Sequence, residues 1–242
     1  MRTMSGSDVV RLWEALEGRS HTERALLLLA HAYPNATLDE VARLPVGQRD
    51  SRLFTLREAM LGKHVQAHAD CPSCAQRLDV QLNTSDFCTA PSRNDTATEL
   101  QHGDYLLQFR APSSLDLLAV SGVADRDMAL RQLLTRCVVA SDAGQAIDPA
   151  SLPAPVIERL ASAMSDGDPQ GELLIELHCP SCHAEPQFLF DVALFYFSEL
   201  AALAKRLLRE VHTLATAYGW SEASILAMSN RRRQSYLQMV GT

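Results

Sequence analysis

The sequence lacks any long apolar run, and this absence excludes a membrane-spanning helix. No purely apolar stretch is longer than residues 25–30, which is far shorter than the ~20 residues needed to cross a bilayer. The first residues also carry no apolar segment of the kind that a secretory signal needs. We therefore expect a cytoplasmic protein without membrane contacts, in which thiols stay reduced and cysteines serve metal binding or catalysis before disulfides.

A net positive charge is also missing, which argues against nucleic acid as a partner. The formal net charge is −7 and the sequence pI is about 5.6. Binding to phosphates requires clustered Lys and Arg, and the one short basic run, residues 231–233, is interpreted as a solvated helix face. The hydrophobic share of 47% is enough for one core plus a small additional module. We expect protein partners.

Common catalytic signatures are absent as well. The sequence contains no GxSxG, no phosphate-binding loop, no GxGxxG and no HExxH, which are the patterns that mark hydrolases, nucleotide-binding enzymes and metalloproteases. The acidic residues are scattered, and their spacing indicates no catalytic pair. We therefore predict that the protein is not an enzyme.

The chain does contain one internal repeat, the tetrapeptide CPSC, at residues 71–74 and 179–182. Each copy lies between two strand-like runs, so each is expected at the turn of a β-hairpin that points two thiolates to the same side. Four cysteine thiolates are the ligands that tetrahedral zinc prefers, and they leave no open position for a substrate. We predict one structural Zn²⁺ bound by Cys71, Cys74, Cys179 and Cys182.

The two copies are separated by 104 residues, which is unusual for a zinc ribbon. Closing this loop instead of one of ~20 residues adds on the order of 1.5 kcal/mol. Structural zinc contributes ~10–16 kcal/mol in finger peptides. The metal therefore outweighs the additional closure entropy.

Other interpretations of these cysteines remain open. They could be small buried residues, a redox CxxC pair, which usually lies at a helix N-terminus, or ligands of iron instead of zinc. The residues after each motif, Ala75 and His183, replace the glycine that often follows a zinc knuckle, so the turn is of another type or strained. Of the other cysteines, Cys137 is expected in the core and Cys88 in a polar loop. A flanking histidine could replace one cysteine ligand, but with four cysteines present the histidines are expected next to the ligands or at the surface: His64, His68, His178 and His183.

Helices dominate the rest of the predicted structure. The apolar residues of 192–218 recur every three or four positions and form one broad stripe, which packs either into the core or against a partner: Tyr196, Leu200, Leu203, Leu207, Val211, Leu214 and Tyr218. Between the two CPSC motifs we predict a surface loop over 83–102, a strand over 105–110, helices over 114–121 and 126–140, a loop over 143–155 and a helix over 156–164.

The predicted fold class is α+β, mainly helical, with a split four-cysteine zinc ribbon made of two CPxC hairpins and a long C-terminal helix. The expected domains are an N-terminal helical region (1–62), the split ribbon (63–87 and 172–191), a central α/β insert (88–171) and a C-terminal region with the long helix and tail helices (192–242).

Several motifs in a fixed order resemble a known family. They are LPVGQRDSRLFTLREAMLG, the first CPSC, FRAPSSLDLLAV, DPQGELLIELHCPSC and the tail YGWSEASILAMSNRRRQSYL. Together they are similar to zinc-ribbon baseplate proteins of phage-like contractile injection systems, related to the T-even phage baseplate family, over about residues 44–240. The resemblance implies a non-catalytic hub component or hub-assembly chaperone, with baseplate hub, spike or tail proteins as partners.

The alternative from a different class is a zinc-ribbon regulator that binds nucleic acid, because paired CPxC hairpins are common in such proteins. The charges near the motifs oppose it. They are predominantly acidic: Asp70, Asp79, Glu172, Glu176, Glu185 and Asp191.

Overall fold

The computed structural model of the chain describes residues 4–84 and 98–241 and confirms the predicted α+β class. Helices make up most of it, and the described strands form three small antiparallel sheets. The chain divides into two compact units, one formed by residues 1–35 together with 192–242 and the other by residues 36–191. None of the helices in the described ranges combines the length and apolar character that a bilayer crossing requires.

The first unit is a cluster of helices around one long helix, α8. Side-chain caps define where the first two helices begin, because Ser5 and Ser20 each form a capping box with the acidic residue three positions later. The unit's helices are α1 (Gly6–Leu16), α2 (His21–Ala32), α8 (Val192–Tyr218), α9 (Glu222–Leu226) and α10 (Asn230–Val240). Helix α8 packs against all of the others, so it organises the unit.

The apolar stripe of α8 is mainly internal core. Five of its predicted members are buried, whereas Leu203 is half-buried and Tyr218 is 38% exposed. The buried ion pair between Arg233 of α10 and Glu210 of α8 fixes the tail helix on the same face. Since α1, α2, α9 and α10 cover most of the stripe, little of it is left for a partner.

The second unit begins with helices and continues into two hairpins and a sheet. Its elements in chain order are α3 (Leu38–Ala42), α4 (Val46–Leu61), β1 (His64–Asp70), β2 (Arg77–Asn83), β3 (Thr98–His102), β4 (Tyr105–Phe109), α5 (Ser114–Val120), α6 (Arg126–Cys137), β5 (Val138–Asp142), β6 (Gln145–Ile147), the 3₁₀ turn Pro149–Ser151, α7 (Ala154–Gly167), β7 (Leu174–Glu176) and β8 (Gln187–Leu189). Strands β1–β2 and β7–β8 each form a separate hairpin.

The four-stranded sheet, in the order β3-β4-β5-β6, carries a core of its own. Apolar residues of β4, β5, α6 and α7 pack into one cluster on one face: Leu107, Phe109, Leu134, Cys137, Val138, Ala140, Leu152, Val156 and Leu160. The opposite face exposes Leu106 and Val139. The cluster includes Cys137, which confirms its prediction as a core residue, and Cys88 lies outside the described residues.

Three sequence predictions in this region were wrong. Residues 98–102 form β3 rather than a loop, because their backbone pairs with β4 although their side chains are mostly exposed. The helix predicted over 126–140 ends at Cys137, and Val138 begins β5, which pairs with β4. The predicted loop over 143–155 contains β6, which closes a tight hairpin with β5.

Two contacts tie together the segments that lead into the two hairpins. The backbone N–H of Gly47, at the start of α4, donates to a carboxylate oxygen of Asp168 at 2.8 Å. A Cβ at Gly47 would come within 2.0 Å of that carboxylate, so only glycine fits there. Phe54 of α4 stacks on Phe190, just after β8, with ring centroids 5.9 Å apart.

Candidate metal centre

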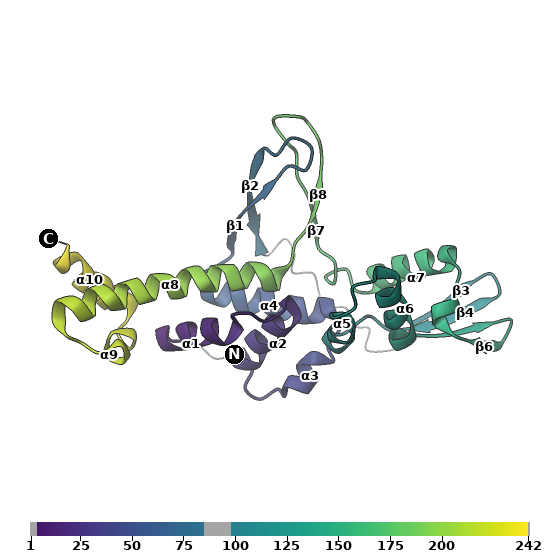
Figure 1. Cartoon of the computed structure of the whole chain (residues 1–242), viewed down its shortest axis with the longest axis horizontal. Helices are drawn as coiled ribbons and strands as arrows, with labels where there is room; N and C mark the ends of the chain where they lie inside the picture. The colour runs from purple at the N-terminus through teal and green to yellow at the C-terminus, as the bar shows by residue number, and fades with distance from the viewer. Residues whose placement is uncertain (1–3, 85–97, 242) are drawn as a thin grey trace. The chain divides into compact units, whose positions relative to one another are not determined.

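Each CPSC motif lies at the turn of a two-stranded hairpin, as predicted. The register of the first hairpin ends at the pair Asp70 and Arg77, and that of the second at Glu176 and Gln187, extended by the bond from Leu177 N–H to Pro186 O. The two hairpins run alongside each other and their turns meet at the far end (Figure 1). Segments 104 residues apart in the sequence thus form one ribbon.

The two turns have the same backbone geometry. In the first, Cys71 N–H donates to Gln76 O at 2.9 Å and Ala75 N–H donates to Cys71 O at 2.8 Å. In the second, Cys179 N–H donates to Ala184 O and His183 N–H donates to Cys179 O, both at 2.9 Å. The repeated sequence therefore folds into a repeated structure.

The residue after each motif adopts a left-handed backbone without being glycine. The φ angle is 58° at Ala75 and 59° at His183, a region that disfavours side chains with a Cβ. The knuckle turn is therefore kept, and each turn carries a strain that glycine would relieve. This settles the question that the missing glycines raised in the sequence.

Backbone N–H groups surround the sulfur atoms. Ser73 and Cys74 donate to the sulfur of Cys71, and Cys182 and Ser181 donate to that of Cys179. The N–H groups of Gln76 and Ala184 do the same for Cys74 and Cys182. Such donors stabilise thiolates, so the turns favour the form of cysteine that binds metal.

The four sulfur atoms form a compact cluster within 4.8 Å of one another. Sγ of Cys71 lies 3.7 Å from Sγ of Cys182, and Sγ of Cys74 lies 3.6 Å from Sγ of Cys179. Four sulfurs at Zn–S distances of ~2.3 Å around a tetrahedral ion would be about 3.8 Å apart. It is the one cluster of this kind in the described part of the chain, and its dimensions fit a single tetrahedral ion.

The four thiols lie so close together that they can all ionise only if a cation balances their negative charges. The N–H of Cys182 lowers the pKa of Cys179 to about 6. At Cys74 the N–H of Gln76 also lowers the pKa, but hydrogen bonding with Cys182, burial and the other cysteines raise it to about 12. A bound metal cation supplies the positive charge that lets four adjacent thiolates coexist. The cysteine cluster can therefore hold one metal ion.

Other candidate ligands stay outside the cluster. The four histidines that flank the motifs are exposed, as expected, and none joins the sulfurs: His64, His68, His178 and His183. The His178 and His183 rings lie 5.6 Å apart at the ribbon surface. A tetrahedral ion bound by all four sulfurs has no open coordination position for a reacting water.

A comparison of the sequence with known protein families shows which family the chain belongs to. Residues 2–196 match the family described as T4 bacteriophage base plate protein. The chain belongs to this family. The match begins earlier than the resemblance seen in the sequence and ends at the start of α8, so the C-terminal tail lies beyond it. Neither the search of curated proteins nor that of solved structures gave a match.

Membership of the baseplate family indicates a phage structural or assembly role. A baseplate protein works by contacting other baseplate or tail proteins. Exposed surfaces and rigid modules are therefore the features that matter for such a role.

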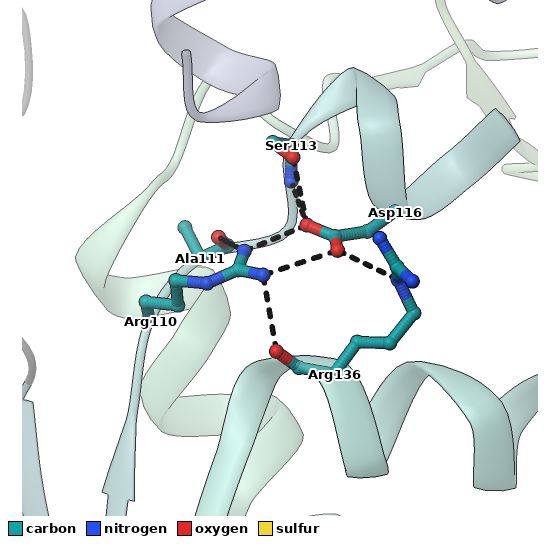
Figure 2. A network of polar contacts seen from close by, with 5 residues as sticks. All are labelled: Arg110, Ala111, Ser113, Asp116 and Arg136. Atoms are coloured by element: carbon teal, nitrogen blue, oxygen red, sulfur yellow. Dashed lines mark hydrogen bonds and ion pairs between the residues drawn. The ribbon is translucent and has the colours of Figure 1, made fainter. Parts of the chain in front are cut away.

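A second polar cluster, which the sequence analysis missed, lies at the start of α5 (Figure 2). The carboxylate of Asp116 accepts hydrogen bonds from Arg110 and from Nε of Arg136, between 2.6 and 3.0 Å, and from the N–H and hydroxyl of Ser113. Its side chain is 1% exposed. Arg110 holds the pKa of Asp116 far below its usual range despite the opposing effect of burial, so the carboxylate stays charged.

Proposed function

We propose that the protein is a non-catalytic structural or assembly protein, with a chaperone-like role, in the baseplate of a phage-tail-like contractile injection system. In this proposal it acts through contacts with hub, spike or tail proteins, and one structural Zn²⁺ stabilises it. The four-cysteine cluster with tetrahedral dimensions and the family match support it.

The physical role of the zinc is to join two distant segments. Apart from the cysteines, Leu78 is the only buried residue of the ribbon's small apolar cluster, and the other apolar contacts there are partly buried. Such a cluster cannot hold two short hairpins together by burial alone. The metal fixes their relative position and makes the ribbon a rigid module that partners can recognise.

The ribbon also presents an apolar surface suited to protein contacts. Leu174 and Leu189 face each other across β7 and β8, and they are 53% and 65% exposed. A cross-strand pair of exposed leucines next to acidic side chains is more typical of a protein interface than of a phosphate-binding face. This supports protein partners over nucleic acid.

The metal part of the proposal is tested by native mass spectrometry of gently purified protein. We expect a mass increase of one zinc ion per chain, and loss of that ion in Cys71→Ser and in Cys179→Ser. Cys137→Ser is the matched control, because it changes a buried cysteine outside the cluster. Metal-free natural protein, or an iron signal in its place, would contradict the zinc assignment.

The assembly part is tested by co-expression with baseplate hub, spike and tail proteins. We expect a stable complex with at least one of them, and a weaker complex after Leu174→Asp with Leu106→Asp as the surface control. Mass spectrometry of finished particles then separates a permanent component from an assembly factor. A protein that stays alone in the presence of every baseplate partner would contradict the proposed role.

A further inference from the structure

A pocket of about 280 Å³ lies beside the Asp116 network, at the junction of α3, α4, β4, α5 and α6. We call it the arginine pocket, and its main lining residues are Arg43, Pro45, Arg110, Leu115, Asp116 and Arg136. The cysteine cluster does not involve any of these residues. The pocket is thus separate from the candidate metal centre.

Its electrostatic balance is positive in a chain whose net charge is −7. Three guanidinium groups and one carboxylate line it. Arg43 donates two hydrogen bonds to the carboxylate of Asp39, from Nε at 2.7 Å and from Nη2 at 3.0 Å. If Asp39 is counted with the lining residues, the pocket still has an excess of one positive charge. Asp116 is already saturated by its hydrogen bonds, so it cannot neutralise a further cation. The pocket therefore attracts a negatively charged group.

Arg136 offers the open hydrogen-bond donors. Only its Nε contacts Asp116, and its two Nη groups have no hydrogen-bond acceptor among the described residues. The side chain is 41% exposed, so these donors are accessible. Two Nη groups held in one plane suit a carboxylate or a phosphate better than a neutral group.

The protein holds the lining of the pocket in place before any ligand arrives. Arg110 is fixed by Asp116 and by the backbone oxygens of Ala111 and Arg136. The opposite wall is fixed as well, because Val46 N–H donates to Pro112 O at 3.0 Å and Pro45 forms a bridge with Ser113. Groups that are already ordered lose little conformational entropy on binding.

We propose that the arginine pocket binds a glutamate or aspartate side chain from an acidic segment of a partner tail protein. The carboxylate meets the Nη groups of Arg136, and the methylene groups lie against Leu115 and Pro45. The volume of about 280 Å³ is large enough to admit one such side chain. This inference rests on the proposed function, because it assumes a protein partner within the baseplate.

The probe is a capped tetraglutamate peptide, followed through the arginine Nε–Hε signals of the ¹⁵N-labelled full-length protein. Saturable shifts are expected for Arg110 and Arg136, and none with capped tetraglutamine. We expect Arg136→Gln to weaken binding about tenfold, as for loss of charge-assisted hydrogen bonds. Arg131→Gln removes the same charge from the exposed surface of the same helix and should leave binding unchanged.

Thermal melting checks that Arg136→Gln is folded. If it is not folded, the Arg43→Gln variant is used instead, because the Arg43 side chain is 67% exposed and Asp39 is its ion-pair partner among the described residues. This variant should weaken binding about threefold, the effect of a surface ion pair. Equal weakening by Arg131→Gln overturns the proposal in favour of general charge attraction. Inorganic phosphate or a short oligonucleotide that binds these arginines more tightly than the peptide also overturns it.

The outcome is independent of the test of the proposed function. If the protein assembles with its baseplate partners but the pocket does not bind tetraglutamate, this inference alone is overturned. A protein that binds the peptide but no baseplate partner would instead remove the proposed role.

Discussion

The cysteine ribbon and the four-stranded sheet belong to the same unit, yet they are stabilised in different ways. The sheet buries nine clustered residues against α6 and α7. The cluster at the cysteine end of the ribbon buries only three, and two of these are Cys71 and Cys179. Strands β1 and β2 add two further buried residues, Val65 and Val80. Apolar burial therefore accounts for the sheet, whereas we propose that the ribbon depends on a metal bound by its four cysteines.

Metal removal should separate the two regions most strongly. A structural zinc contributes on the order of 10 kcal/mol, which exceeds what Leu78 and its half-buried neighbours can replace. Treatment with a strong chelator should make the amides of β1, β2, β7 and β8 exchange rapidly, as measured by hydrogen–deuterium exchange. The amides of β4 and β5 should stay protected. Collapse of protection in both regions at once would contradict their independence.

The reverse experiment weakens the apolar core of the four-stranded sheet and leaves the cysteine cluster unchanged. Leu160→Ala should lower the free energy of unfolding of the sheet region by about 2–5 kcal/mol, because Leu160 is 1% exposed and leaves a cavity. Zinc content, measured by native mass spectrometry, should remain one ion per chain. The control is Leu130→Ala on α6, which is 40% exposed and should change unfolding little.

The Asp116 network should make the sheet region sensitive to strong acid only. Asp116→Asn should destabilise it at neutral pH by about 2–3 kcal/mol, the scale of hydrogen bonds to a charged group. The pKa of Asp116 is lowered in the folded state, so its contribution is complete above the unfolded pKa of about 3.9. As the pH falls below about 4, Asp116 takes up a proton in the unfolded chain while the folded carboxylate stays charged. The difference between the two proteins should therefore shrink progressively as the pH falls towards the folded-state pKa, as measured by chemical denaturation.

If the difference in unfolding free energy between the natural protein and Asp116→Asn is the same at pH 7 and at pH 2, the charge of Asp116 does not contribute and the residue acts by shape alone. Arg126→Gln serves as a control, because that exposed residue lies outside the network.

The smallest expected effect lies in the ribbon turns. Ala75→Gly and His183→Gly should each stabilise the metal-bound ribbon by up to about 1 kcal/mol, because the left-handed backbone disfavours a Cβ. Ala67→Gly in β1 should do the opposite, since glycine weakens a strand interior. Both effects are measured as the resistance of the bound zinc to removal by a competing chelator. Destabilisation by Ala75→Gly would show that the turn is not strained.

Sequence reasoning succeeded where the pattern was local and repeated. The duplicated CPSC located the cysteine cluster because both copies impose the same turn on the chain. The regular apolar spacing of 192–218 predicted α8 with the correct ends. Both signals come from contacts that are encoded within a few residues, so they survive without knowledge of the tertiary structure.

Sequence reasoning failed where structure depends on distant partners. Val138 follows an apolar helical pattern, and only its pairing with Phe109 makes it part of a strand. Residues 98–102 are polar and mostly exposed, so no alternation marks β3. The arginine pocket joins Arg110, Asp116 and Arg136, which follow no motif; the capping-box spacing of Ser113 and Asp116 was the one local signal, and it indicates a helix start and not an ion network.

The order of elements has a consequence for synthesis on the ribosome. Helices α1 and α2 pack on α8, but roughly 160 residues separate the end of α2 from the start of α8. At ~5–20 residues per second, the first two helices wait about 8–30 s for their packing partner. During that interval Leu16 and Leu28, which are fully buried in the finished protein, have no α8 to cover them. Nascent chains halted before residue 192 should therefore be the species most prone to aggregate.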